Sequence, residues 1–197
     1  MCWTPFLKRH WEALAATDFF TVEVATWHGL VTYDVLVVMD LATRRVQVAG
    51  ITPHPTDVFM VQCARPLTDP LEDFLLGQRY LLHDRDTRYT RAFDAFLKDR
   101  GIEPVLLPPR SPNLNAYYER FLCAIKEEAL EQLLMLGKRF LSQVIRQYLA
   151  HYHTERNHQG RGNQLMTPEP ARNDQGGAVV RRDRLCGLLC YSCRDAA

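Results

Sequence analysis

Three acidic residues are spaced along the chain as a two-metal phosphoryl-transfer site requires. Asp18 lies at the start of an apolar, strand-like run, and Asp84 ends a second run of the same kind. Glu119 lies near the start of a helical pattern, with 34 residues between it and Asp84. Because two strands and a helix can bring such acids together, we expect Asp18, Asp84 and Glu119 to bind Mg²⁺ or Mn²⁺ through oxygen.

Two other acids compete with these assignments. Asp86 lies two residues beyond Asp84 and also beside Arg85, which can pair with either acid. We prefer Asp84 because the predicted strand ends there, at the edge of the sheet where ligands bind. Asp40 also follows a strand, but it immediately precedes a turn, where aspartate commonly forms local hydrogen bonds. We therefore interpret Asp40 as structural.

The helix that carries Glu119 offers further acids and a lysine. Lys126 follows Glu119 by seven residues, which at 100° per residue places the two side chains within about 20° of each other. Glu128 falls on the opposite side, and Glu127 and Glu131 remain competitors. A Glu–Lys stripe is also typical of a solvated face. If Glu119 is a metal ligand, Lys126 is a contact to a DNA phosphate or base.

Two further segments carry polar side chains that suit phosphate. The proline-rich loop before Glu119 holds Asn113 and Asn115 as donors, although Asn115 also fits a helix N-cap. Residues 151–160 place three histidines around Glu155, together with Arg156. A metal site is conceivable there, but we favour DNA contact or local structure, with Arg156 and His158 as candidates.

Residue patterning predicts a mixed sheet with helices on both faces. Three strands rich in Val, Thr, Tyr and Phe follow one another as an antiparallel meander, and two more strands alternate with helices. The predicted strands are 19–26, 30–39, 45–51, 80–83 and 102–107. The predicted helices are a lead-in within residues 1–16, then 57–67, 90–100, 116–134 and 138–152.

Composition is that of an ordinary globular protein. The 197 residues suit one domain, and 47% of them are hydrophobic. No apolar run is long enough for a membrane span, so we expect a cytoplasmic, nucleoid-associated protein without a membrane partner. The net charge is only +1, although 20 of the 24 basic residues are arginine. Zinc at Cys186, Cys190 and Cys193 is disfavoured, because they form no paired CxxC and no histidine is near.

The motifs taken together resemble the catalytic core of insertion-sequence transposases and retroviral-type integrases. The resemblance rests on three blocks, 17–20, 83–89 and 111–121, and on a closing segment at 151–160. It implies an RNase H-like fold whose five-stranded mixed sheet begins with three antiparallel strands. It also implies a DDE site of Asp18, Asp84 and Glu119 that binds two Mg²⁺ ions. The implied reactions are hydrolysis of a phosphodiester at an element end and attack of the freed 3′-hydroxyl on target DNA.

The resemblance sets out domains and partners. We expect a lead-in helix at 1–13, a catalytic core at 14–165 and a tail at 166–197. DNA contacts are expected from Lys126, Arg120, Asn113, Asn115, Arg156 and His158. The protein should be at least a dimer, and a separate domain or protein is expected to read the element ends. The alternatives are an RNase H-like nuclease without strand transfer, or an inactive remnant that binds DNA or a partner transposase.

Overall fold

The computed structural model describes residues 3–71, 74–108, 116–156, 165–166 and 179–194. The chain forms two compact units, one of residues 1–23 and 30–122 and the other of residues 24–29 and 123–197. The strands of the first sheet are β1 (Leu14–Thr26), β2 (Gly29–Asp40), β3 (Val46–Thr52), β4 (Tyr80–His83) and β5 (Glu103–Leu106). The helices are α1 (Trp3–His10), α2 (Asp57–Leu67), α3 (Arg91–Asp99), α4 (Ala116–Ile125) and α5 (Gly137–Thr154), and a 3₁₀ turn, η1 (Trp11–Ala13), follows α1.

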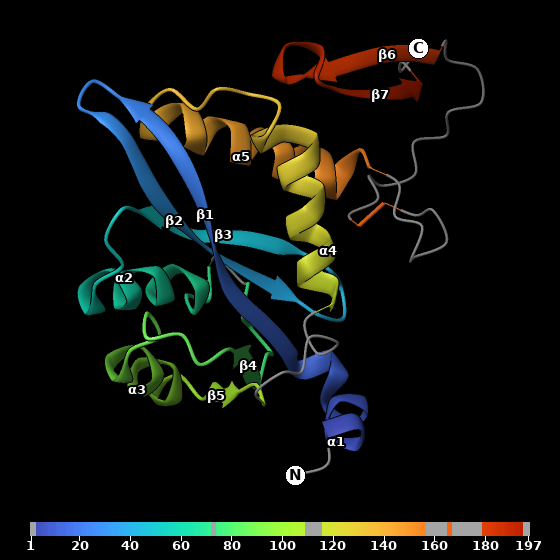
Figure 1. Cartoon of the computed structure of the whole chain (residues 1–197). Coiled ribbons are helices and arrows are strands. Elements are labelled where there is room, and N and C mark those ends of the chain that lie inside the picture. Colours follow the sequence, from blue (N-terminus) through green and yellow to red (C-terminus); the bar gives the residue numbers. More distant parts are fainter. Residues whose placement is uncertain (1–2, 72–73, 109–115, 157–164, 167–178, 195–197) are drawn as a thin grey trace. The chain divides into compact units, whose positions relative to one another are not determined.

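The five strands form one mixed sheet in the order β3-β2-β1-β4-β5 (Figure 1). The first three strands are an antiparallel meander, as predicted. β4 pairs in parallel with both β1 and β5, so the central strand β1 joins the antiparallel half to the parallel half. The chain makes tight turns between the early strands, and Gly29, with φ of 111°, supplies the left-handed conformation at the first of them. Asp40 accepts backbone hydrogen bonds from Ala42 and Thr43, which confirms its structural role.

The first strand begins earlier than its sequence predicts. A helical lead-in was expected through residue 16, but the helix ends at His10 and β1 starts at Leu14. Leu14, Ala15 and Ala16 pair in parallel with Tyr80, Leu81 and Leu82, and all three are buried. Pairing with β4 therefore overrides the local helical periodicity, a tertiary effect that a single stretch of sequence does not reveal.

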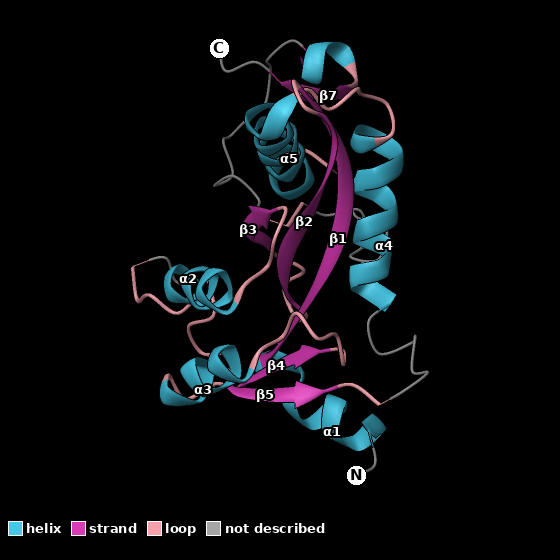
Figure 2. Cartoon of the chain, turned by 60° about the vertical axis from the view of Figure 1, so that its left-hand side comes forward, coloured by secondary structure: helices cyan, strands magenta, loops and turns pink. Residues whose placement is uncertain are grey.

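Helices α2 and α3 cover one side of the sheet, and the start of α4 lies on the other (Figure 2). Both predicted helix starts are capped: the hydroxyls of Thr56 and Thr90 each accept the backbone N–H three residues on. The core between these helices and the sheet is apolar throughout, and it includes Phe19, Leu36, Met60, Leu81 and Phe93. This packing fixes the strands whose ends carry the candidate site.

Gly50 lets α2 approach β3 closely. A Cβ at this position would lie 2.4 Å from the Sγ of Cys63 and 2.6 Å from the ring of Phe59. The ladder also shifts register here, because Leu36 pairs with Gly50 and Val37 with Val48. Contacts this short do not occur in folded proteins, so the added methyl group must displace the Cys63 sulfur and the Phe59 ring, both of which α2 carries.

We expect Gly50→Ala to lower the free energy of unfolding by about 1–3 kcal/mol, the usual cost of overpacking a core. Urea unfolding of the two proteins measures this loss. Gly77→Ala is a useful comparison, because a Cβ there meets no atom within 4 Å and only its positive φ is strained. Equal stability of wild type and Gly50→Ala would contradict the close approach.

The second unit contains α5, a short π-helix and a hairpin. The predicted helix 116–134 is wrong in its second half, because α4 ends at Ile125 and a π-helical stretch, η3 (Lys126–Leu130), follows. Residues 179–194 form an antiparallel hairpin of β6 (Val179–Arg184) and β7 (Leu189–Arg194), joined by a 3₁₀ turn, η5 (Leu185–Gly187). No strand was predicted there, because the segment is rich in arginine and cysteine.

Candidate active site

Asp18 lies on the central strand, where its carboxylate is half-buried. The backbone N–H of Phe19 donates a hydrogen bond of 2.7 Å to one carboxylate oxygen, Oδ1. Burial raises the pKa of Asp18 from 3.8 to about 6; the Phe19 N–H and Arg88 oppose the shift, whereas the charges of Asp84 and Asp86 add to it. A carboxylate in this environment favours a cation beside it over isolation.

Asp84 lies next to Asp18 across the parallel pair β1–β4. The ladder joins Leu14 to Tyr80 and Ala16 to Leu82; Asp18 lies two residues further along β1, and Asp84 directly follows the end of β4. The charge of Asp84 contributes to the raised pKa of Asp18, so the two carboxylates lie within electrostatic reach of each other. Asp84 is exposed, and its Oδ1 accepts the backbone N–H of Asp86 at 3.0 Å. The structure thus brings two of the three predicted acids together.

Arg88 engages Asp86, the predicted competitor of Asp84. Its Nε donates to Oδ2 of Asp86 at 2.9 Å, and its backbone N–H donates to Oδ1 at 2.8 Å. The hydrogen bond from Arg88 holds the pKa of Asp86 below its usual value. The oxygens of Asp86 are therefore committed to arginine, whereas Asp84 keeps its second oxygen for another ligand. This arrangement favours Asp84 as the oxygen donor, as the sequence analysis proposed.

The guanidinium of Arg88 also reaches the central strands. It pairs with Asp34 on β2 and lies 4.3 Å from the centre of the Phe19 ring. Arg88 thereby connects the loop after β4 to β2 through Asp34 and to β1 through Phe19. Neither Arg88 nor Asp34 was predicted as a site residue, because the two are 54 residues apart and only the fold brings them together.

Glu119 lies near the start of α4 and is exposed. Within the part of the chain that the structure describes, no three His, Cys, Asp or Glu side chains are grouped closely enough to hold a metal ion. The structure therefore does not bring Glu119 into one ligand group with Asp18 and Asp84. The assignment of Glu119 stays a prediction.

Two tyrosines, the buried Tyr118 and the partly buried Tyr89, lie within electrostatic reach of the two aspartates. Tyr118, the residue before Glu119, is fully buried, and its hydroxyl has no hydrogen-bond partner among the described residues. Burial raises its pKa, and the charges of Asp18 and Asp84 raise it further. The pKa of Tyr89 is raised for the same reasons. These effects show that the start of α4 is within electrostatic reach of the carboxylate pair.

The carboxylate pair suits a hard divalent cation. Its donors are oxygens, and burial and mutual repulsion make the ionised form of Asp18 costly without a neighbouring positive charge. Mg²⁺ is bound through one or two protein carboxylates, with water and substrate phosphate completing its octahedral shell. Asp18 and Asp84 meet the first of these requirements.

The residues predicted to contact DNA differ in where the structure places them. Arg120 is exposed on α4, and Lys126 is half-buried at the start of η3. Helical spacing of 100° per residue does not hold through a π-helix, so positions beyond Lys126 do not follow the predicted face. Asn113, Asn115 and His158 lie outside the described residues.

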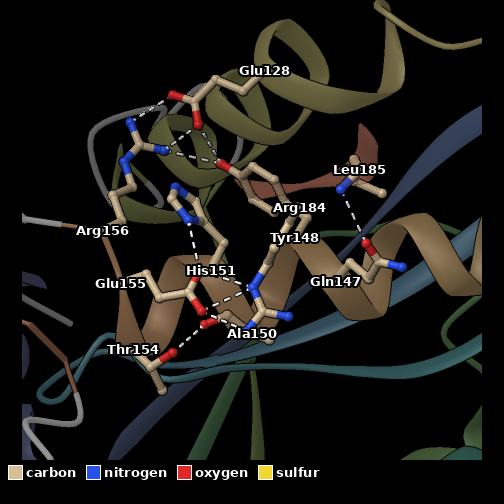
Figure 3. Close-up of polar contacts among 10 residues, drawn as sticks. All are labelled: Glu128, Gln147, Tyr148, Ala150, His151, Thr154, Glu155, Arg156, Arg184 and Leu185. Carbon is tan, nitrogen blue, oxygen red and sulfur yellow. Dashed lines mark hydrogen bonds and ion pairs between the residues drawn. The ribbon is translucent and has the colours of Figure 1, made fainter. Parts of the chain in front are cut away.

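Arg156 is held within the second unit (Figure 3). Its two terminal nitrogens each lie 2.7 Å from a carboxylate oxygen of Glu128, and Nη1 also donates to the Tyr148 hydroxyl at 3.0 Å. Tyr148 in turn donates to Glu128 at 3.1 Å. The bidentate geometry is that of a strong arginine–carboxylate pair. This pair gives Arg156 a structural role, the local alternative to DNA contact that the sequence left open.

A second network fastens the hairpin to α5 (Figure 3). Nε of Arg184 donates to both oxygens of Glu155, at 2.9 and 2.8 Å, and Glu155 is also 3.1 Å from Nδ1 of His151. Burial opposes ionisation of Glu155, but Arg184 and His151 hold its pKa below the usual value. The backbone N–H of Leu185 donates to Gln147. Gln147 and His151 on α5 and Glu155, directly after its end, recur every four residues and form one stripe.

The cysteines and histidines near the C-terminus form no metal group within the described residues. Cys186 and Cys190 are exposed free thiols, and Sγ of Cys190 accepts a hydrogen bond of 2.9 Å from Arg181. His151 is engaged with Glu155. No described helix is long and apolar enough to cross a membrane.

Comparison with known proteins agrees with the observed fold. Residues 100–168 match the family model described as an integrase core domain. The HTLV-2 integrase catalytic core domain, solved in complex with magnesium in a trimeric form, superposes with a TM-score of 0.58 at 15% identity, covering 79% of this chain and 93% of that one. This chain has the fold of an integrase catalytic core.

Two further solved structures give the same result. The dimeric form of the HTLV-2 integrase core, also in complex with magnesium, has a TM-score of 0.53 at 16% identity and covers 72% of this chain and 86% of that one. The catalytic core of BIV integrase has a TM-score of 0.52 at 17% identity, covering 72% of this chain and 84% of that one. A search of curated proteins gave no match. The predicted integrase-like fold is therefore confirmed.

Proposed function

We propose that this chain is the catalytic core of a DNA integrase or transposase, which hydrolyses a phosphodiester and then transfers the 3′-hydroxyl end to target DNA. The observation that carries the proposal is that Asp18, within β1, and Asp84, directly after the parallel strand β4, lie within electrostatic reach of each other in an integrase-core fold. Glu119, near the start of α4, is proposed as the third ligand of a DDE site.

Each residue of the proposed site has a different role. Asp18 and Asp84 provide carboxylate oxygens; the Phe19 N–H fixes one oxygen of Asp18, and the Asp86 N–H fixes one of Asp84. Arg88 holds Asp86 away from the metal position. Two bound Mg²⁺ or Mn²⁺ ions would activate the attacking oxygen and stabilise the leaving oxygen. The HTLV-2 integrase cores that share this fold were solved with magnesium, which supports the choice of cation.

The proposal includes DNA and a second copy of the chain as partners. One HTLV-2 core was solved as a dimer and one as a trimer, which supports assembly of this core as well. Joining two element ends also requires two active sites, so a dimer is the smallest competent form. A separate reader of the element ends is proposed as an additional partner.

Mn²⁺-dependent nicking and joining of plasmid DNA at low salt tests this function. Asp84→Asn and Glu119→Gln should each lose at least about 100-fold in rate, since a metal ligand contributes several kcal/mol to the transition state. Asp99→Asn, an exposed acid at the end of α3, is the matched control and should keep wild-type activity. Nicked products without joined products would indicate a nuclease that lacks strand transfer. Activity in Glu119→Gln would remove that residue from the site.

A further inference from the structure

The turn between β1 and β2 presents a tryptophan to solvent. Trp27 is 102% exposed, the largest value among the described apolar residues. Ala25, two residues earlier, donates its N–H to the carbonyl of Met135 at 2.8 Å and pairs in parallel with Leu136. Leu134 and Leu136 are also exposed. Single exposed apolar residues are common, but three large ones brought to one edge of a folded unit indicate a contact surface.

Cations begin where this apolar edge ends. Helix α5 starts at Gly137, directly after Leu136, and its 18 residues contain no Asp or Glu. Arg139, Gln143 and Arg146 are all exposed and recur at spacings of four and three, which places them on one helix face. No ion pair joins Lys138, Arg139 or Arg146 to another described residue. The exposed face of α5 is therefore cationic over its first half, from Lys138 to Arg146.

The two units differ in charge. The unit formed by residues 24–29 and 123–197 has eleven Lys and Arg against eight Asp and Glu, a net of +3. The other unit has thirteen against fifteen, a net of −2, and it carries the aspartate pair. A carboxylate site repels the phosphates on which it is proposed to act. Affinity for a polyanion must then come from cations elsewhere in the chain.

We propose that Lys138, Arg139, Gln143 and Arg146 on α5, together with Trp27 at the adjoining turn, form a DNA-contact surface. This inference rests on the proposed function, because DNA is its ligand. Arginine and lysine bind backbone phosphates without reading sequence, and an exposed indole stacks on an unpaired or distorted base. The combination of an aromatic edge with an acid-free cationic face fits nucleic acid better than an acidic or apolar protein.

Fluorescence anisotropy with labelled duplex and single-stranded DNA, measured from about 50 to 200 mM salt, tests the surface. The double variant Arg139→Ala/Arg146→Ala should bind at least about tenfold more weakly at low salt, and its salt slope should fall by about 2, one for each lost phosphate contact. Trp27→Ala should weaken binding to single-stranded DNA by about fivefold or more and leave the salt slope unchanged.

The matched control is Arg91→Ala/Arg100→Ala, which removes two exposed arginines from the other unit at a similar spacing. It should keep wild-type affinity and slope, and thermal melting checks that all variants remain folded. A wild-type chain that binds no DNA would refute the proposed function itself. Wild-type binding that is reduced no more by the α5 variant than by the control would overturn this inference alone. Unchanged DNA affinity with altered sedimentation would identify the surface as a contact between copies, which also overturns it.

Discussion

Asp18→Asn should abolish Mn²⁺-dependent cleavage, by about 1,000-fold, and yet leave the metal-free protein more stable than wild type at pH 7. The loss of activity follows from losing a charged metal ligand, worth several kcal/mol in the transition state. The gain in stability follows from the raised pKa of Asp18, about 6 in the folded protein against an ordinary 3.8. Few substitutions in a folded core combine these two effects.

The pH dependence has a definite sign. Because the folded state holds the Asp18 proton more tightly than the unfolded chain does, its contribution to stability is fully present below about pH 4 and is lost as pH rises through 6. Partial exposure of the side chain reduces the expected loss to about 1–2 kcal/mol. Asparagine does not titrate, so the variant should not show this loss.

Urea unfolding in EDTA from pH 4 to 8 measures the difference. The free energy of unfolding of Asp18→Asn minus that of wild type should increase between pH 4 and 7. Addition of Mn²⁺ at pH 7 should stabilise wild type and not the variant, because only a ligand that binds the folded state shifts the equilibrium. A difference that stays constant with pH would show that Asp18 is not desolvated as described.

Arg88→Ala is expected to cost about 2–4 kcal/mol in the free energy of unfolding, together with at least about a tenfold loss of activity. The substitution leaves the half-buried carboxylates of Asp34 and Asp86 without their shared cation. It also frees the loop after β4, in which the Asp86 N–H holds one oxygen of Asp84. Disorder of that loop degrades the site even where the protein stays folded.

Arg88→Lys tests whether the positive charge of Arg88 is sufficient or whether its hydrogen bonds to Asp86 and Asp34 are also needed. Lysine keeps the positive charge but cannot donate in parallel to Asp86 while reaching Asp34, so it should recover part of the stability and little of the activity. Arg100→Lys, at an exposed arginine beside the Phe96 ring, is the matched control. Full activity in Arg88→Lys, with wild-type dependence on Mn²⁺ concentration, would reduce Arg88 to a simple counter-charge.

Much of the fold was predictable from residue patterning, because strand alternation and helix capping are local. The meander, the starts of α2 and α3, and the parallel strand β4 were all expected at nearly their observed positions. The early start of β1 was not, since it depends on pairing with Tyr80–Leu82, far along the chain. The hairpin at 179–194 was also missed, because its stability comes from α5 rather than from its own polar sequence.

The site was predictable to a similar extent. Asp18 and Asp84 stood out because acids at the ends of apolar strands are unusual and costly. Arg88 was not recognised, because its two carboxylate partners come from a different strand and from its own loop. For Arg156 the sequence left DNA contact and local structure open, and in the fold its guanidinium pairs with both oxygens of Glu128, 28 residues away in sequence. Pairings across the fold, rather than residue types, decide these roles.

The hairpin that pairs with α5 affects where the chain can be truncated to produce a shorter protein. A boundary at residue 165, which the integrase resemblance suggests, would retain Glu155 and His151 but discard Arg184. A shortened core would then carry the buried Glu155 without the arginine that pairs with it, next to a face of α5 that the hairpin no longer covers. Poor solubility of such a fragment would be a flaw of its design and would say nothing about the catalytic competence of the intact chain.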